Sequence, residues 1–85
     1  MDKVANSVTK LQATFRIRVN GESVAIETVG QAYTFITRLS TVEWMEFRAL
    51  HDEARAMLEA AADNAILSGK ATNALRALFV KTRLL

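Results

Sequence analysis

The chain of 85 residues contains no cysteine. Disulfide frameworks and thiolate metal sites are therefore excluded, and the absence of thiols fits a reducing cytoplasm. No apolar run approaches the roughly 20 residues that a membrane-spanning helix needs. The first 13 residues also lack the apolar segment of a signal peptide. We therefore expect a cytoplasmic protein that does not enter a membrane.

Glycine and histidine are scarce. The three glycines, Gly21, Gly30 and Gly69, are dispersed and form no phosphate-cradling loop. His51 is the only histidine, and no carboxylate stands three or four residues away from it on a helix. Because a metal site needs several ligands, we expect a surface or boundary histidine. The sequence predicts no cofactor and no metal site.

Carboxylate pairs recur at helical spacing, Glu43 with Glu46 and Glu59 with Asp63. General acid–base catalysis needs such pairs in a partly dry cleft that separates their pKa values. Here the carboxylates stand beside Arg55 or on a helix side that we expect to be exposed to solvent. The scattered serines offer no local triad geometry. We expect no enzymatic activity and no catalytic residue.

What the chain does contain is a clear hairpin signal in FRIRVNGESVAI, residues 15–26. Apolar residues alternate with Arg16 and Arg18, as in a strand with one buried face. Asn20-Gly21 suits a two-residue type I′ turn, which needs positive φ at both central positions. That register pairs Ile17 with Val24 and Phe15 with Ile26. An isolated ribbon is marginal in water, so helices must cover it.

Helical patterns follow the hairpin. Thr28 and Gln31 match a capping box, which opens a helix over residues 29–39. Ser40 and Glu43 match a second one, and the apolar pattern then runs over residues 42–67 with no proline or glycine to break it. Ser68-Gly69-Lys70 is interpreted as a helix stop, because glycine suits the left-handed position after a helix. Thr72 is then expected to cap a last helix containing Leu75, Leu78, Phe79 and Thr82.

These elements predict an α+β fold in the order ββααα, with two or three helices packed on one face of the hairpin. Residues 14–85 form a single domain, and residues 1–13 are a frayed tail or an edge segment. A continuous helix over residues 42–67 would be about 39 Å long. A compact domain of this size is only about 31 Å across. Either the helix breaks, near His51-Asp52, or its end overhangs and packs against another subunit. Because no proline or glycine marks a break, we expect a long helix and a homodimer, with an exposed hairpin edge as a further place for the second copy.

Charge is divided along the sequence, with net +3 in residues 1–21, −5 in residues 22–63 and +4 in residues 64–85. The main interpretation is solvated surface, but such asymmetry also favours self-association or an anionic partner. A nucleic-acid interface would use the basic hairpin face and the C-terminal helix, with Thr72 and Asn73 on a reading helix. Its candidate residues are Arg16, Arg18, Arg76, Lys81 and Arg83.

Residues 15–83 also resemble a small uncharacterised bacterial domain family found mainly in alphaproteobacteria such as rhizobia. The resemblance rests on the FRIRV strand, the TVGQAYTFITRL helix, Trp44, the alanine-rich helix ending at Gly69, and LRALFVKT. Trp44-Met45 stands where the family usually has Trp-Pro, and the cysteine often present in its middle helix is absent. The resemblance implies a compact α/β fold and no established activity.

The sequence therefore predicts a small non-enzymatic interaction protein, cytoplasmic and homodimeric, with a protein partner of unknown identity. Exposed strand edges are normally covered or paired, which places the partner at the hairpin. A weak nucleic-acid-binding or regulatory protein is the alternative.

Overall fold

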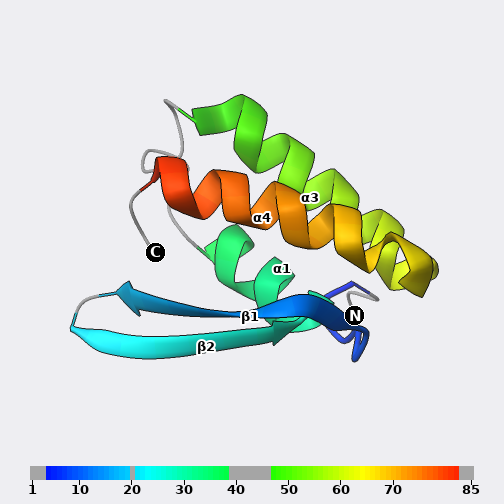
Figure 1. The fold of residues 1–85 in the computed structure, drawn as a ribbon, viewed down its shortest axis with the longest axis horizontal. Helices are drawn as coiled ribbons and strands as arrows, with labels where there is room; N and C mark the ends of the chain where they lie inside the picture. Colours follow the sequence, from blue (N-terminus) through cyan, green and yellow to red (C-terminus); the bar gives the residue numbers. More distant parts are fainter. Residues whose placement is uncertain (1–3, 20, 39–46, 83–85) are drawn as a thin grey trace.

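The computed structural model describes residues 4–19, 21–38 and 47–82. A two-stranded antiparallel sheet lies on one side, and helices cover one of its faces (Figure 1). The elements follow in the order β1 (Lys10–Val19), β2 (Glu22–Thr28), α1 (Val29–Arg38), α3 (Arg48–Asp63), the short 3₁₀ helix η2 (Ala65–Leu67) and α4 (Ser68–Lys81). The predicted α+β fold, a hairpin followed by helices, is confirmed.

The hairpin has the predicted register. Phe15 pairs with Ile26, Ile17 pairs with Val24, and Val19 and Glu22 flank the connection. Gly21 has a φ of 80°, which glycine adopts without steric cost, whereas Asn20 lies outside the described residues. Phe15, Ile17 and Ile26 are buried beneath the helices. The hairpin therefore forms the base of the core.

Strand β1 begins at Lys10, four residues before the expected domain boundary, and its pairing is irregular between Lys10 and Phe15. The chain before it packs against the start of α1. There Val29 N donates to the carbonyl of Thr9 at 2.8 Å and Gly30 N donates to the carbonyl of Ser7 at 3.1 Å. A helix cannot satisfy its own first amides, so this segment supplies acceptors for two of them.

The junction of β2 and α1 is the predicted capping box. Gln31 N donates to Thr28 Oγ1 at 3.1 Å, and Gln31 Oε1 accepts from Thr28 N at 3.3 Å. Gln31 Oε1 also accepts from Glu27 N at 2.7 Å. This reciprocal pair fixes the point at which the strand turns into a helix. The second predicted box, Ser40 with Glu43, lies outside the described residues.

The expectation of one helix through residue 67 is wrong. Helix α3 ends at Asp63 and Asn64 is extended, with φ −141° and ψ 104°. The Asn64 side chain accepts a hydrogen bond from Ile66 N at 3.1 Å, which holds the chain in a turn. The 16 residues of α3 span about 24 Å, which fits a molecule measuring 30 × 25 × 24 Å. Helix length therefore gives no support for a dimer.

The expected stop at Ser68-Gly69-Lys70 is also wrong, since these residues form the first turn of α4. Thr72 is not a cap but a buried residue inside the helix, and its hydroxyl donates to the Ser68 carbonyl at 2.8 Å. Asn64, rather than Gly69, separates the two helices. The apolar residues expected in this helix are correctly placed, because Leu75, Leu78 and Phe79 are fully buried.

Phe79 lies at the centre of the core. Its ring meets Phe15 edge-on at a centroid distance of 5.3 Å and Phe35 at 6.0 Å. Strand β1, helix α1 and helix α4 therefore share one aromatic cluster. No helix in the described part of the chain is both long and apolar enough to cross a membrane.

Candidate functional site

The two edges of the hairpin are the first candidate site, because no other strand of the described residues lies beside β1 or β2. Residues flanking a two-residue loop form a hydrogen-bonded pair, and pairs of the two kinds then alternate along the ladder. The pairs that follow the turn alternately lack these hydrogen bonds, and they are Arg18–Ser23 and Arg16–Ala25. Their backbone N–H and C=O groups point away from the hairpin, two residues on each edge.

Helix α4 closes the first part of the β1 edge. Gln12 N donates to Thr72 Oγ1 at 2.9 Å, and Gln12 Nε2 donates to Ser68 Oγ at 3.1 Å. Further along, the Arg76 guanidinium lies 5.9 Å from the centroid of the Phe15 ring. Thr72 and Arg76 are one turn apart, so one side of α4 follows β1. Past this closed part, no described residue bonds the outward groups of Arg16 and Arg18.

The β2 edge is closed at the corresponding end. The outward amide of Glu27 is taken by Gln31 Oε1 at 2.7 Å. Ser23 and Ala25 follow toward the turn, and both are exposed. No hydrogen bond from the described residues reaches their outward groups. Each edge is therefore blocked at the end far from the turn, at Gln12 on β1 and at Glu27 on β2, and open at the end near the turn.

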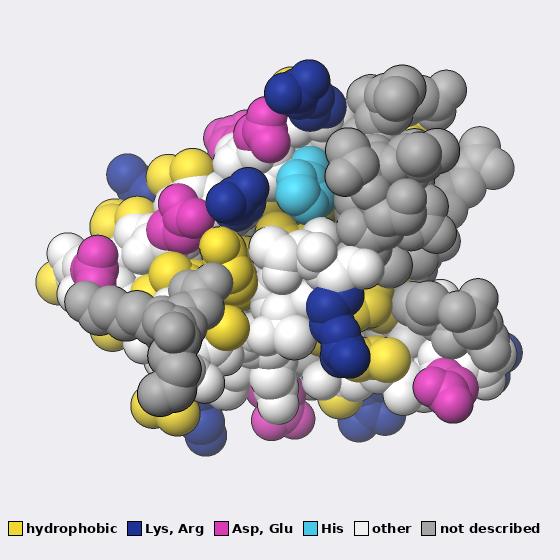
Figure 2. Space-filling view, turned by 180° about the vertical axis from the view of Figure 1, so that it is seen from behind, with side chains coloured by type: hydrophobic (Ala, Val, Ile, Leu, Met, Phe, Trp, Pro, Cys, Tyr) yellow, Lys and Arg dark blue, Asp and Glu magenta, His cyan; other side chains and the backbone are white. Residues whose placement is uncertain are grey.

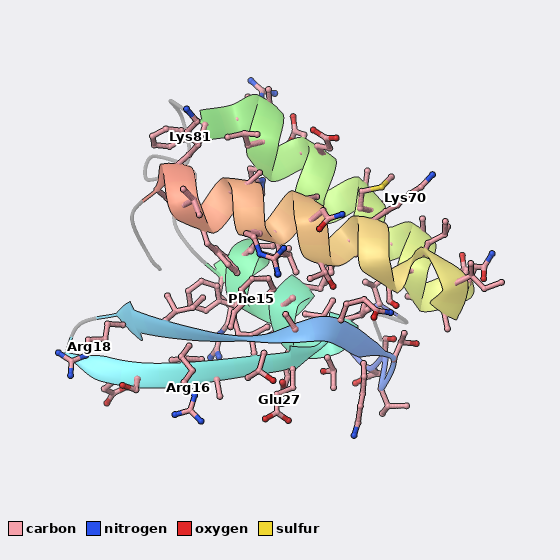
Figure 3. The ribbon with its side chains drawn as sticks, in the orientation of Figure 1. Phe15, Arg16, Arg18, Glu27, Lys70 and Lys81 are labelled. Atoms are coloured by element: carbon pink, nitrogen blue, oxygen red, sulfur yellow. The ribbon has the colours of Figure 1, made fainter. Side chains whose placement is uncertain are left out.

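The five basic residues predicted for nucleic-acid binding do not share one face. Arg16 and Arg18 extend from the side of the sheet that faces away from the helices, whereas Lys81 lies at the far side of the molecule (Figure 3). Arg76 stands on the helix side of β1. Arg83 lies outside the described residues. A reading helix would also need an accessible Thr72, but Thr72 is buried.

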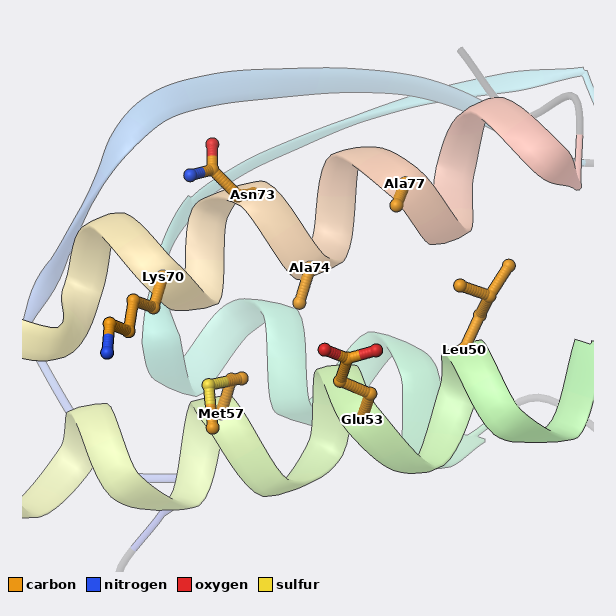
Figure 4. A pocket seen from close by; sticks show the side chains of 7 residues that line it. All are labelled: Leu50, Glu53, Met57, Lys70, Asn73, Ala74 and Ala77. Carbon is orange, nitrogen blue, oxygen red and sulfur yellow. The ribbon is translucent and has the colours of Figure 1, made fainter.

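An open groove of about 310 Å³ lies between α3 and α4. Four apolar and three polar side chains line it (Figure 4): Leu50, Glu53, Met57, Lys70, Asn73, Ala74 and Ala77. Glu53 extends from α3 and Lys70 from α4. One carboxylate and one amine on opposite helices are fewer groups than a nucleophile, a base and an oxyanion site require. The lining suits packing of an apolar side chain better than chemistry.

His51 is a boundary residue, as predicted, and Figure 2 shows its ring at the surface of the back face. Its Nε2 lies 3.1 Å from the Ile36 carbonyl near the end of α1. Its Nδ1 lies 3.9 Å from a carboxylate oxygen of Asp52, the next residue in the chain. The described part of the chain holds no group of three or more potential metal ligands. His51 therefore joins α3 to the end of α1.

Glu59 belongs to a polar contact between α1 and α3. The hydroxyl of Tyr33 donates to Glu59 Oε2 at 3.4 Å, and Arg55 Nε lies 3.5 Å from the same oxygen. The neighbouring Tyr33 hydroxyl, and then the charge of the Glu59 carboxylate, raise the pKa of Arg55 above its ordinary value. Arg55 therefore stays charged, and Glu59 is held as its ion-pair partner. Glu43 and Glu46 lie outside the described residues.

The closure of the two edges was missed in the sequence. Gln31 could have been identified, because the same oxygen that completes the capping box also accepts from Glu27 N. Gln12 carries no such local signal, since its partners Thr72 and Ser68 stand 60 and 56 residues further along the chain.

No family model matches the chain. The curated proteins give no significant match, and neither do the solved structures. The resemblance to the alphaproteobacterial family stays a prediction that rests on the residues quoted for it.

Proposed function

We propose that this chain is a small non-enzymatic interaction protein of the cytoplasm that forms a homodimer through the edge of β2. One observation carries the proposal: the outward backbone groups of Ser23 and Ala25 have no hydrogen-bond partner among the described residues. An open strand edge pairs readily with another chain unless it is blocked. Here the blocking residue, Gln31, acts only at Glu27.

A second copy related by a two-fold axis at Ala25 pairs both outward groups of Ala25, and it pairs the outward amide of Ser23 with the carbonyl of the second copy's Glu27, whose own amide stays with Gln31 Oε1. Ala25 then faces Ala25 of the second copy, and Ser23 faces its Glu27. Small side chains at the centre allow the strands to approach closely, and Glu27 comes near the Arg18 that stands beside Ser23 in the sheet. Pairing of opposite charges sets the register more than it adds affinity.

The pairing joins two hairpins into one four-stranded antiparallel sheet with the helices on the same face. A contact limited to one strand edge is small, and interfaces below about 1,200 Å² in total belong to weak complexes. We therefore expect a dimer that dissociates on dilution. Such a protein would bring together two copies of whatever its other surfaces bind.

The test uses two proline variants at positions that face each other across the hairpin. Ala25→Pro removes the outward N–H of the β2 edge, and Arg16→Pro removes that of the β1 edge. Neither substitution removes a hydrogen bond inside the hairpin, because the N–H groups of both residues point away from the opposite strand. Proline is tolerated at such strand positions. Sedimentation velocity over a concentration series should show dimers for the wild type and for Arg16→Pro, and monomers for Ala25→Pro.

Circular dichroism spectra that match the wild type serve as the folding control for both variants. A wild type that stays monomeric at the highest concentration contradicts the homodimer, and so does a dimer that survives Ala25→Pro.

A further inference from the structure

Arginines flank the open part of the β1 edge. The two elements along it, β1 and α4, contain no aspartate or glutamate. Three of their cations lie at the open edge, Arg16 and Arg18 on β1 and Arg76 over Phe15, whereas Lys70 lines the α3–α4 groove and Lys81 lies at the far side of the molecule. The nearest acids of the sheet, Glu22 and Glu27, stand on β2. Charge at this edge therefore differs from that at the edge of β2.

The cations lie on both sides of the strand. Arg16 and Arg18 extend from the face opposite the helices (Figure 3), whereas the Arg76 guanidinium lies over Phe15 on the helix side. One turn beyond Arg76, Val80 is 58 % exposed. An added strand would run about 4.8 Å from β1. Side chains of the added strand on the face opposite the helices would then meet Arg16 and Arg18. Those on the helix side would meet Arg76 and Val80.

We propose that the β1 edge at Arg16 and Arg18 binds an extended acidic segment of a partner protein, which adds to the sheet as a third strand. The outward backbone groups of both residues supply the hydrogen bonds, as in other β-strand additions. Acidic residues at every second position pair with Arg16 and Arg18, and apolar residues between them face α4. The site is separate from the homodimer edge, so either proposal can fail alone.

The probe is a fluorescein-labelled peptide of eight residues that alternates glutamate and valine, titrated with the full chain by fluorescence anisotropy. Octaglutamate tests charge without strand propensity, and oligothymidylate tests a nucleic acid. We expect the alternating peptide to bind about tenfold more tightly than either control. This difference corresponds to one or two additional hydrogen bonds between the peptide and the strand.

Protein variants separate the backbone from the charge. Arg16→Ala removes one charge and keeps the N–H, whereas Arg16→Pro removes both. We expect Arg16→Pro to bind the alternating peptide about tenfold more weakly than Arg16→Ala, the loss of one well-formed hydrogen bond. Ala25→Pro, on the other edge, and Lys81→Ala, at the far side, should bind within about twofold of the wild type.

A second measurement needs no variant. On addition of the alternating peptide to the wild type, the amides of Arg16 and Arg18 should exchange more slowly with solvent, and those of Ser23 and Ala25 should not change. Equal binding of Arg16→Pro and Arg16→Ala overturns the strand addition, as do unchanged amides at Arg16 and Arg18. Oligothymidylate binding as tight as that of the peptide identifies an electrostatic surface for nucleic acid instead.

Discussion

Replacing Phe79 with alanine is expected to lower the free energy of unfolding by about 3–5 kcal/mol. Phe79 is fully buried, and its ring packs edge-on against both Phe15 and Phe35. The substitution leaves a cavity where β1, α1 and α4 meet. A domain of this length has a total stability of roughly 4–13 kcal/mol. The expected loss is therefore a large part of the total free energy of unfolding. Urea denaturation followed by circular dichroism measures it.

Val80→Ala is the matched control for Phe79→Ala. Val80 is the next residue of the same helix, but 58 % of it is exposed. Surface substitutions usually change stability by less than about 0.5 kcal/mol. Equal losses for the two variants would show that Phe79 does not occupy the centre of the core.

Gly30→Ala is expected to destabilise the protein by roughly 1–3 kcal/mol, the usual cost of overpacking. A Cβ at Gly30 would lie 2.6 Å from the carbonyl oxygens of Ala5 and Ser7, which are backbone atoms and cannot rotate aside. The segment before β1 must move away, which breaks the bond from Gly30 N to Ser7. The gain in helix propensity, about 1 kcal/mol at most, offsets part of the cost.

Gly69→Ala provides the contrast, because a Cβ there would meet only Gln12 Cγ at an ordinary 3.7 Å. We expect this variant to be as stable as the wild type or more stable, by up to about 1 kcal/mol. Thermal unfolding of the two variants under one set of conditions measures the difference. A Gly30→Ala protein as stable as Gly69→Ala would mean that the segment before β1 does not pack on α1.

Local chemistry accounts for what the sequence predicted well. The register of the hairpin follows from alternation and from a two-residue loop, and both are visible within residues 15–26. The start of α1 follows from Thr28 and Gln31, whose hydrogen bonds span three residues. Such features depend on neighbours in the chain, so a single sequence suffices to find them.

The errors in the helical region have two causes, a local turn signal at Asn64 and the tertiary packing of α4 against β1. The alanine-rich run before residue 66 reads as continuous helix, yet a turn held by the Asn64 side chain ends α3 at Asp63. Gly69 reads as a stop, but it stands in the first turn of α4, close to Gln12. The open edges were expected in the sequence. Their partial closure by Thr72 could not be, because Gln12 lies 60 residues away from it.

Pairing of two copies through β2 is tested most directly by a single cysteine at its centre, since the natural chain has none. In the proposed dimer Ala25 faces itself, at a distance that a disulfide spans. Ala25→Cys in a glutathione redox buffer should therefore form a covalent dimer. Ser23→Cys, on the same strand and face, should stay monomeric, because two Ser23 positions lie about 14 Å apart in that register. Absence of cross-linking at Ala25, or equal cross-linking at both positions, would contradict the account.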